Sequence, residues 1–136
     1  MKLFLDTNVL LDGYFQRDGA ASSNAVIARC NGVNDSGWIA WHSLSNGFYL
    51  VRGHSKSSAI ATQFITDLLS WADVVETSKS DAQWAAQSGL KDFEDALQLS
   101  AAMAVGADAL ITRNTADFIS STIPVLTPEQ FLSAFP

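Results

Sequence analysis

Short apolar segments alternate along the whole chain with longer segments of helical periodicity. Strands separated by helices are joined by crossover connections, so they pair in parallel and carry helices on both faces of the sheet. The sequence therefore predicts an α/β fold, a three-layer α/β/α sandwich around a central parallel sheet. The segments expected to form strands are residues 2–6, Gly37–Trp41, Asp73–Glu76, Asp108–Thr112 and, at an edge of the sheet, Pro124–Leu126.

Seven segments carry apolar periodicity or end signals typical of helices. Ser22 is expected to cap the second of them and Gly32 to end it, Gly106 to end the sixth, and Thr127 to cap the last, with Pro128 in its first position. The expected helices are Val9–Phe15, Ser22–Gly32, Leu44–Arg52, Ser57–Trp71, Asp81–Gln87, Phe93–Val105 and Pro128–Phe135.

The length of 136 residues suits one domain, and neither an internal repeat nor a Pro- or Gly-rich linker divides it, so residues 1–136 are expected to form a single domain. The apolar runs fall short of the ~20 residues that span a bilayer. Met1 leads directly into a strand, without the pattern of a secretory signal. Cys30 is expected to be a buried thiol, and a cytoplasmic protein without membrane contact is predicted.

The charge balance is 8 basic against 14 acidic residues, a net charge of 8 − 14 = −6. This balance argues against a protein that holds duplex nucleic acid through a broad basic face. Any contact with nucleic acid is therefore expected to be local or bridged by a metal ion.

Three segments place acids at points where buried elements end or begin. Asp6 follows the first apolar strand, Asp92 and Asp95 open the strong helix at Phe93–Val105, and Asp117 follows the strand that ends near Thr112. The carboxyl ends of parallel strands share one edge of the sheet, where open α/β sheets bind ligands. The sequence predicts that Asp6, Asp95 and Asp117 share a pocket. From helical spacing, Glu94 is expected to point away from Asp92 and Asp95.

Several carboxylates in one pocket imply a bound cation. Two of them about 5 Å apart repel by roughly 3 kcal/mol at an effective dielectric of about 20, unless a proton or a cation intervenes. Oxygen ligands favour Mg²⁺ or Mn²⁺ over Zn²⁺. Because Mg²⁺ held by carboxylates commonly serves phosphoryl chemistry, phosphodiester hydrolysis is the leading reaction, with Arg113 as the candidate phosphate contact. Helix capping by Asp92 and a surface role for Arg113 stay open.

These segments, taken together, resemble PIN domains, the fold of VapC-type toxin ribonucleases. The resemblance rests on Phe4-Leu5-Asp6-Thr7-Asn8-Val9-Leu10, on Lys91-Asp92-Phe93-Glu94-Asp95-Ala96-Leu97-Gln98, and on Ile111-Thr112-Arg113-Asn114 with Asp117-Phe118. It covers nearly the whole chain, with the motifs in the family's order. It implies a sheet of four or five strands, Mg²⁺- or Mn²⁺-dependent cleavage of RNA, a small antitoxin partner and a homodimer.

Carried onto this sequence, the resemblance implies that Asp6, Asp95 and Asp117 are the catalytic metal ligands. Asp92 either joins them or only caps the helix. Residues expected to support the ligands from behind are Thr7, Asn8, Asn46, Thr112 and Asn114.

One position departs from the family's pattern. Asn46 stands where many members carry a Glu early in the helix after the second strand. An amide can offer an oxygen ligand but no charge, so the site loses one negative unit and some metal affinity is expected to go with it. Asp92 or Glu94 is a candidate to compensate.

Three other readings compete with a nuclease. A flavodoxin-like phosphoacceptor domain needs a Lys at the end of a late strand, where this chain has Thr112-Arg113. A Ser or Cys nucleophile lacks a Gly-x-Ser-x-Gly motif or a partnered His. The remaining alternative is a catalytically weak PIN-like protein that binds RNA or a partner. The four Trp residues are a possible contact surface for it, although at least two are expected in the core.

Overall fold

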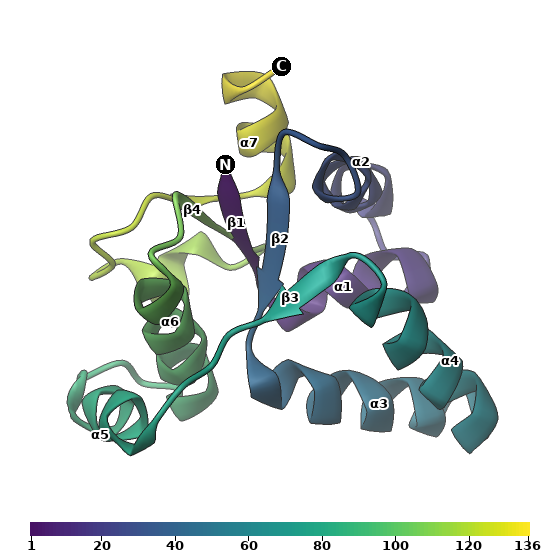
Figure 1. The fold of residues 1–136 in the computed structure, drawn as a ribbon, viewed down its shortest axis with the longest axis horizontal. Helices are drawn as coiled ribbons and strands as arrows, with labels where there is room; N and C mark the ends of the chain where they lie inside the picture. The colour runs from purple at the N-terminus through teal and green to yellow at the C-terminus, as the bar shows by residue number, and fades with distance from the viewer.

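The computed structural model describes all 136 residues and contains one five-stranded, all-parallel sheet in the order β3-β2-β1-β4-β5. The predicted α/β/α sandwich is confirmed. Figure 1 shows the helices on both sides of the sheet, with both chain ends at one end of the molecule. The strands are β1 (Lys2–Leu5), β2 (Ser36–Ile39), β3 (Ala72–Val74), β4 (Ala109–Ile111) and β5 (Val125–Leu126).

Seven α-helices and one short 3-10 helix connect the strands. Every predicted helix is present, and Phe93–Val105 has the predicted bounds, ended by Gly106 in the left-handed conformation (φ 63°). The helices are α1 (Thr7–Phe15), α2 (Ala20–Cys30), α3 (Trp41–Ser55), α4 (Ser58–Leu69), α5 (Lys79–Gln87), α6 (Phe93–Val105), η1 (Thr115–Phe118) and α7 (Pro128–Ala134). None of the helices has the length and apolar character that a membrane span requires.

Both predicted ends of α2 were wrong, and α3 runs three residues further at each end than the predicted Leu44–Arg52. Helix α2 begins after Gly19, whose φ of 82° suits glycine, so Ser22 lies inside the helix and is not its cap. The same helix ends at Cys30, before Gly32. Thr127, in contrast, caps α7 as predicted, since its hydroxyl accepts a hydrogen bond from the Gln130 amide.

The central strand β1 is buried on both faces because consecutive residues serve two cores. Leu3 and Leu5 pack with α1, α2, α4 and α7, whereas Phe4 packs with α6 and η1 on the other face. Such a strand reads as a continuous apolar run, as seen in Leu3-Phe4-Leu5. Its carboxyl end, and with it Asp6, is therefore fixed by packing from both sides.

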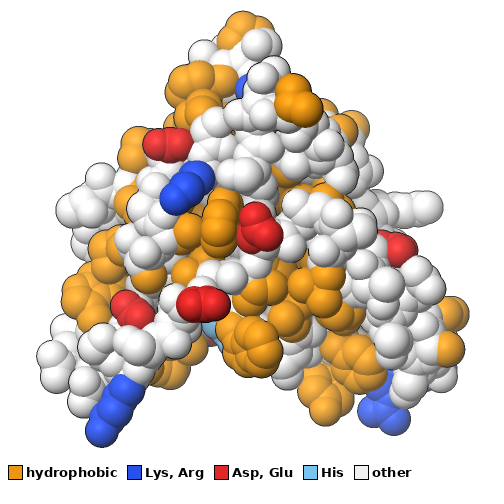
Figure 2. Space-filling model, viewed as in Figure 1, with side chains coloured by type: hydrophobic (Ala, Val, Ile, Leu, Met, Phe, Trp, Pro, Cys, Tyr) orange, Lys and Arg blue, Asp and Glu red, His pale blue; other side chains and the backbone are white.

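The aromatic and sulfur side chains divide between core and surface. Cys30 is buried, as predicted. Trp38 and Trp71 are half-buried and pack against the two cores, whereas Trp41 and Trp84 are 71% and 40% exposed. Trp41, predicted as the last residue of a strand, instead opens α3. Figure 2 shows isolated basic and acidic side chains on one face and no basic patch there, in agreement with the net charge.

Candidate metal centre

Asp6 lies where β1 ends, and it is buried. Its backbone amide continues the ladder by donating to the Ile111 carbonyl of β4 (3.0 Å). Its carboxylate accepts a hydrogen bond from the Thr112 hydroxyl (2.8 Å), which follows β4. Adjacent parallel strands thus bring together two residues 106 positions apart, as the sequence predicts. The Thr112 hydroxyl also accepts a hydrogen bond from the backbone N–H of Asn114. This bond fixes the hydroxyl that in turn orients the Asp6 carboxylate.

The pKa of the Asp6 carboxyl is raised to about 6. Burial is the main cause, and the nearby Glu94 charge adds to it, whereas the hydrogen bond from Thr112 opposes it. A carboxylate placed in such surroundings favours either a proton or a cation.

Asp92, Glu94 and Asp95 converge at the amino end of α6. Each can offer an oxygen within 4.8 Å of the other two. Asp92 is the cap of the helix: its Oδ1 accepts from the amides of Glu94 (2.8 Å) and Asp95 (3.2 Å). The cap folds back over the first turn, where side chains tilt toward the helix start, so the ordinary helical spacing does not separate these three groups. Glu94 therefore stays within reach of Asp92 and Asp95, although its side chain lines a different cavity from theirs, as the prediction that it points elsewhere implies.

Asp95 is the acid on which four neighbouring carboxylates act. Its pKa is raised to about 7, first by burial and then by the charges of Asp92, Glu94, Asp6 and Asp117. Asp95 is therefore near both other predicted ligands, Asp6 and Asp117.

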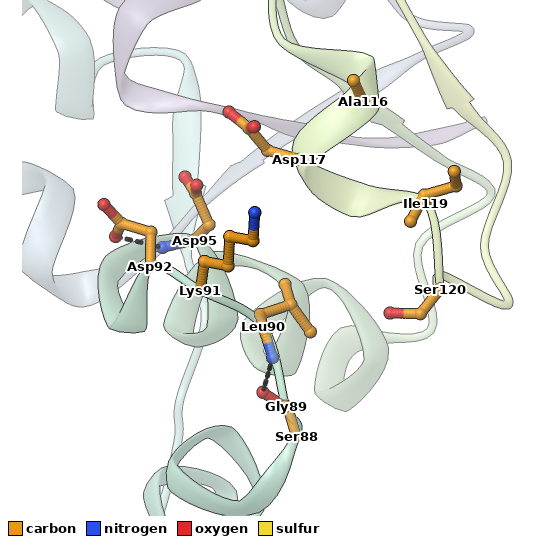
Figure 3. Close-up of a pocket in the computed structure, with 10 residues that line it drawn as sticks. All are labelled: Ser88, Gly89, Leu90, Lys91, Asp92, Asp95, Ala116, Asp117, Ile119 and Ser120. Carbon is orange, nitrogen blue, oxygen red and sulfur yellow. Dashed lines mark hydrogen bonds between the residues drawn. The ribbon is translucent and has the colours of Figure 1, made fainter.

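Two cavities adjoin these acids. One, of about 380 Å³, is lined by Asp6, Thr7, Asn8 and Asn46 together with Glu94 and the exposed Tyr49 and Leu50. The other, of about 480 Å³, lies between the start of α6 and η1 and contains Asp92, Asp95 and Asp117. Figure 3 shows Asp92 and Asp95 on α6 with the Asp117 carboxylate above them, on the 3-10 helix. The predicted single pocket is therefore replaced by two cavities, with Asp6 at one and Asp95 and Asp117 at the other. Asp95 is near the acids of both cavities.

The predicted supporting residues take different places. Asn8 and Asn46 line the Asp6 cavity, and the Asn8 side chain accepts a hydrogen bond from Arg17. Thr7 is turned into the protein, where its hydroxyl bonds Ser43 (2.8 Å) and Gln98 (2.8 Å). Thr7 thus supports the site through Gln98.

Arg113 is held by the protein on every guanidinium nitrogen. It donates to buried Asp12 (3.0 Å), to both oxygens of Glu129 (2.7 and 2.9 Å), to Ser23 (2.9 Å) and to the Gly19 carbonyl. Its place in the structure is a tie between α1, α2 and α7, so the predicted phosphate contact has no free donor there.

Lys91 is a cation to which the sequence alone assigned no role in the site. It lines the cavity that contains Asp95 and Asp117, is exposed, and forms no ion pair. Its position directly before the acidic helix start was the available signal in the sequence. Figure 3 shows its amino group extending into this cavity.

The family model for the PIN domain matches residues 2–116, most of the chain. The chain belongs to the PIN domain family. No curated protein matches it. PIN-like structure extends beyond the matched residues, because solved structures superpose over almost the full length of this PIN domain.

Three of these structures come from toxin–antitoxin systems. VapBC-1 from nontypeable Haemophilus influenzae superposes with a TM-score of 0.73 at 17% identity, over 95% of this chain and 99% of that one. A toxin–antitoxin complex from Klebsiella pneumoniae gives 0.69 at 23% identity, over 93% and 97%. VapBC2 from Rickettsia felis, bound to a DNA fragment from its promoter, gives 0.67 at 22% identity, over 93% and 97%. At these identities the likeness establishes the fold.

The donor set fits a hard divalent cation. The acids at the two cavities supply only oxygen, and neither Cys30 nor either histidine lies among the residues that line these cavities, although His42 contacts Glu94 from outside them (3.1 Å). Oxygen-only surroundings suit Mg²⁺ or Mn²⁺. The neighbouring acids also add to the rise in the pKa of Asp95, and a cation bound among them relieves this repulsion.

The raised pKa values predict a pH-dependent stability in the absence of metal. In the unfolded chain an Asp titrates near pKa 3.9, whereas the folded Asp6 and Asp95 hold their protons to about 6 and 7. The folded state therefore binds more protons between these values, so the free energy of unfolding falls as pH rises from about 4 to about 7. Urea denaturation in EDTA at pH 5 and pH 7.5 measures this. The prediction would be contradicted if the free energy of unfolding changed between the two pH values by the same amount in wild type and in Asp6→Asn.

Asp92 serves the helix as well as the cluster, and two substitutions separate these roles. Asp92→Ala removes the cap and is expected to lower the free energy of unfolding by about 1 kcal/mol. Asp92→Ser keeps a capping oxygen and is expected to cost only a few tenths of that, while it removes the charge. Urea denaturation compares the two variants. An Asp92→Ser protein as unstable as Asp92→Ala would show that the carboxylate charge, not the cap, holds the helix.

Proposed function

We propose that this PIN domain is an Mg²⁺- or Mn²⁺-dependent endoribonuclease that hydrolyses RNA phosphodiesters, and that it is the toxin of a toxin–antitoxin pair. The observation that carries the proposal is the convergence of Asp6, Asp92, Glu94 and Asp117 around Asp95, whose pKa is raised to about 7 by burial and by these four charges. A purely structural role gives no reason to gather several carboxylates beside two open cavities.

The roles of the residues follow from their positions. Asp6 and Asp95 are the proposed principal ligands, because both are fixed by strand and helix ends, and exposed Asp117 closes the site from η1. When bound, the divalent cation supplies an activated water and stabilises charge on the phosphate and on the leaving oxygen. Thr112 keeps the Asp6 carboxylate oriented through its hydrogen bond.

Lys91 takes the role first assigned to Arg113. Its amino group stands at the cavity of Asp95 and Asp117, where it can contact a non-bridging phosphate oxygen. One such contact suits an acidic protein, since the RNA would be held locally by the cation and Lys91 and not by a broad basic face.

The second candidate function is a PIN domain that binds RNA or a protein partner with little turnover. Exposed Trp41 and Tyr49, both on α3, favour it, because aromatic side chains of this kind stack on bases or anchor a partner. Residue 46 also contributes an amide, not a carboxylate, to the Asp6 cavity.

Cleavage of a mixed panel of single-stranded and structured RNAs separates the two functions. The nuclease is expected to cut in Mg²⁺ or Mn²⁺, to stop in EDTA, and to lose the activity in Asp95→Asn. Retardation of the same RNAs without cutting, equal in wild type and Asp95→Asn, would favour binding without turnover.

The toxin assignment extends to this chain what is known of the toxin–antitoxin structures with the same fold. Expression of the wild-type chain alone in bacteria is expected to arrest growth, and Asp95→Asn is expected to remove the arrest at equal protein level. Equal growth with both proteins would contradict the toxin role. The small antitoxin partner, the homodimer and the cytoplasmic location stay predictions.

A further inference from the structure

We propose that Glu94 is a ligand of the divalent cation bound at Asp6, and that Gln98 and His42 hold its carboxylate in place for this purpose. The inference rests on the proposed metal-dependent function and adds a residue to that site. Sequence spacing had directed Glu94 away from the acids, so the position of its side chain is a finding of the structure.

Glu94 and Asp6 line the same cavity. Asp6 enters this cavity from the end of β1, Asn46 from α3 and Glu94 from α6. The side chain at residue 46 brings no charge, so Glu94 is the carboxylate that shares the cavity with Asp6. It is also near Asp95, since its charge acts on both aspartates.

Two neighbours hold the Glu94 carboxylate by one oxygen. His42 Nε2 lies 3.1 Å and Gln98 Nε2 2.8 Å from Oε1, and both bonds therefore fall on the same oxygen. The other oxygen, Oε2, accepts no bond from His42 or Gln98, Asp95 approaches the carboxylate as well, and the side chain is 37% exposed, so the carboxylate remains open to a ligand in the cavity. A fixed, accessible carboxylate is the arrangement that a metal ligand needs.

Gln98 is oriented by Glu94 at the expense of its own hydrogen bonding. It is fully buried, and its Nε2 lies within hydrogen-bond distance of Glu94 (2.8 Å), Thr7 (2.8 Å) and Ser43 (3.2 Å), whereas its Oε1 has no partner. Turning the amide over would let Oε1 accept from one of the two hydroxyls, which share a hydrogen bond with each other, but it would set that oxygen against the carboxylate. Leaving a buried acceptor unpaired is unfavourable, because the group loses its hydrogen bonds to water without gaining a partner. The observed orientation therefore indicates that the bond to Glu94 decides it.

The same network joins three elements of the site. Thr7 opens α1, Ser43 and His42 lie in the first turn of α3, and Gln98 lies one turn after Glu94 on α6. The hydroxyls of Thr7 and Ser43 are 2.8 Å apart and buried. Glu94 is thus fixed relative to Asp6, because the residue after Asp6 belongs to the network that holds Glu94.

Binding of Mn²⁺ tests this inference without reference to cleavage. Isothermal titration and the Mn²⁺-induced rise in melting temperature are measured for wild type, Glu94→Gln and, as matched control, Glu76→Gln, which changes an exposed glutamate outside the two acidic cavities. Glu94→Gln is expected to weaken Mn²⁺ binding at least tenfold, roughly the effect of losing a supporting ligand. Glu76→Gln is expected to bind as wild type does.

Two further variants separate ligation from folding. The double variant Asn46→Glu with Glu94→Gln returns a carboxylate to the same cavity from α3 and is expected to recover much of the affinity. Gln98→Met keeps the Glu94 carboxylate but removes its buried donor, and it is expected to weaken Mn²⁺ binding by a smaller factor than Glu94→Gln. Melting in EDTA shows for each variant that the protein is folded.

The outcomes distinguish this inference from the proposed function. Unchanged Mn²⁺ affinity in a folded Glu94→Gln protein would overturn the role of Glu94 and leave the metal-dependent function standing. A wild-type protein that binds no Mn²⁺ would overturn both.

Discussion

Asp6→Asn is expected to reduce metal-dependent RNA cleavage at least about 100-fold and, at the same time, to stabilise the metal-free protein at neutral pH. The first effect follows from the loss of the buried ligand at the end of β1. The second follows because the amide keeps an oxygen for the Thr112 hydroxyl but carries no charge to be buried.

The size of the stabilisation follows from the raised pKa of Asp6. A rise in the pKa of Asp6 from 3.8 to about 6 corresponds to at most about 3 kcal/mol of unfolding free energy at neutral pH, which Asp6→Asn would recover. Urea denaturation in EDTA at pH 7.5 measures it. Asp18→Asn, an exposed aspartate at the surface, is the control and is expected to change neither activity nor stability. Loss of stability in Asp6→Asn, with cleavage retained, would show that Asp6 is a structural residue.

The carboxylates expected to serve activity are thus also expected to lower the stability of the metal-free protein. The fold accepts raised pKa values at Asp6 and Asp95, two positions that packing fixes. Functional sites commonly retain such unfavourable charges because bound ligand relieves them.

Arg113→Met is expected to lower the free energy of unfolding by about 3 kcal/mol, because it leaves the buried Asp12 carboxylate without its closest cation. Arg17 remains at 3.6 Å but is more exposed, so it is expected to compensate only in part. The guanidinium also lies directly over Gly19, where a Cβ would meet its Nη2 at 2.5 Å. The loss would therefore loosen α1, α2 and α7 together.

The matched variants locate the effect. Glu129→Gln removes the half-exposed partner of Arg113 and is expected to cost about 1 kcal/mol or less. Asp12→Asn combined with Arg113→Met removes the buried charge with its partner and is expected to recover part of the loss. Mn²⁺ affinity per folded protein is expected to stay as in wild type. A stable Arg113→Met protein that binds RNA poorly would restore the phosphate-contact role predicted from sequence.

Local signals predicted much of the fold. Gly106 and Thr127 mark helix ends because their effects are confined to one turn: a left-handed residue ends α6, and a hydroxyl caps α7. The positions of Asp6 and Thr112 followed from the rule that parallel strands end at one edge, which needs only the strand order. The start of α2 was misplaced because Gly19 supports the turn by its left-handed backbone and offers no capping side chain.

Side-chain direction was harder to predict than position. Helical spacing placed Glu94 on another face from Asp92 and Asp95 but did not show that its carboxylate stays near theirs, because at a helix start the cap residue folds back over the first turn. Nothing in the motif Thr112-Arg113-Asn114 shows that the guanidinium turns back to Asp12 and Glu129, since these partners lie 101 and 16 positions away in the chain. Such contacts depend on how the helices pack, which periodicity does not specify.

The most direct test of the central claim follows metal occupancy and RNA cleavage in the same titration. Mn²⁺ is added stepwise to the metal-free protein with a labelled single-stranded RNA, and the rise in melting temperature and the initial cleavage rate are measured at each concentration. We expect both to saturate over the same Mn²⁺ range and both to be lost in Asp6→Asn. Cleavage that persists in EDTA or in Asp6→Asn, or full occupancy with no cleavage of any RNA, would contradict a metal-dependent ribonuclease at this site.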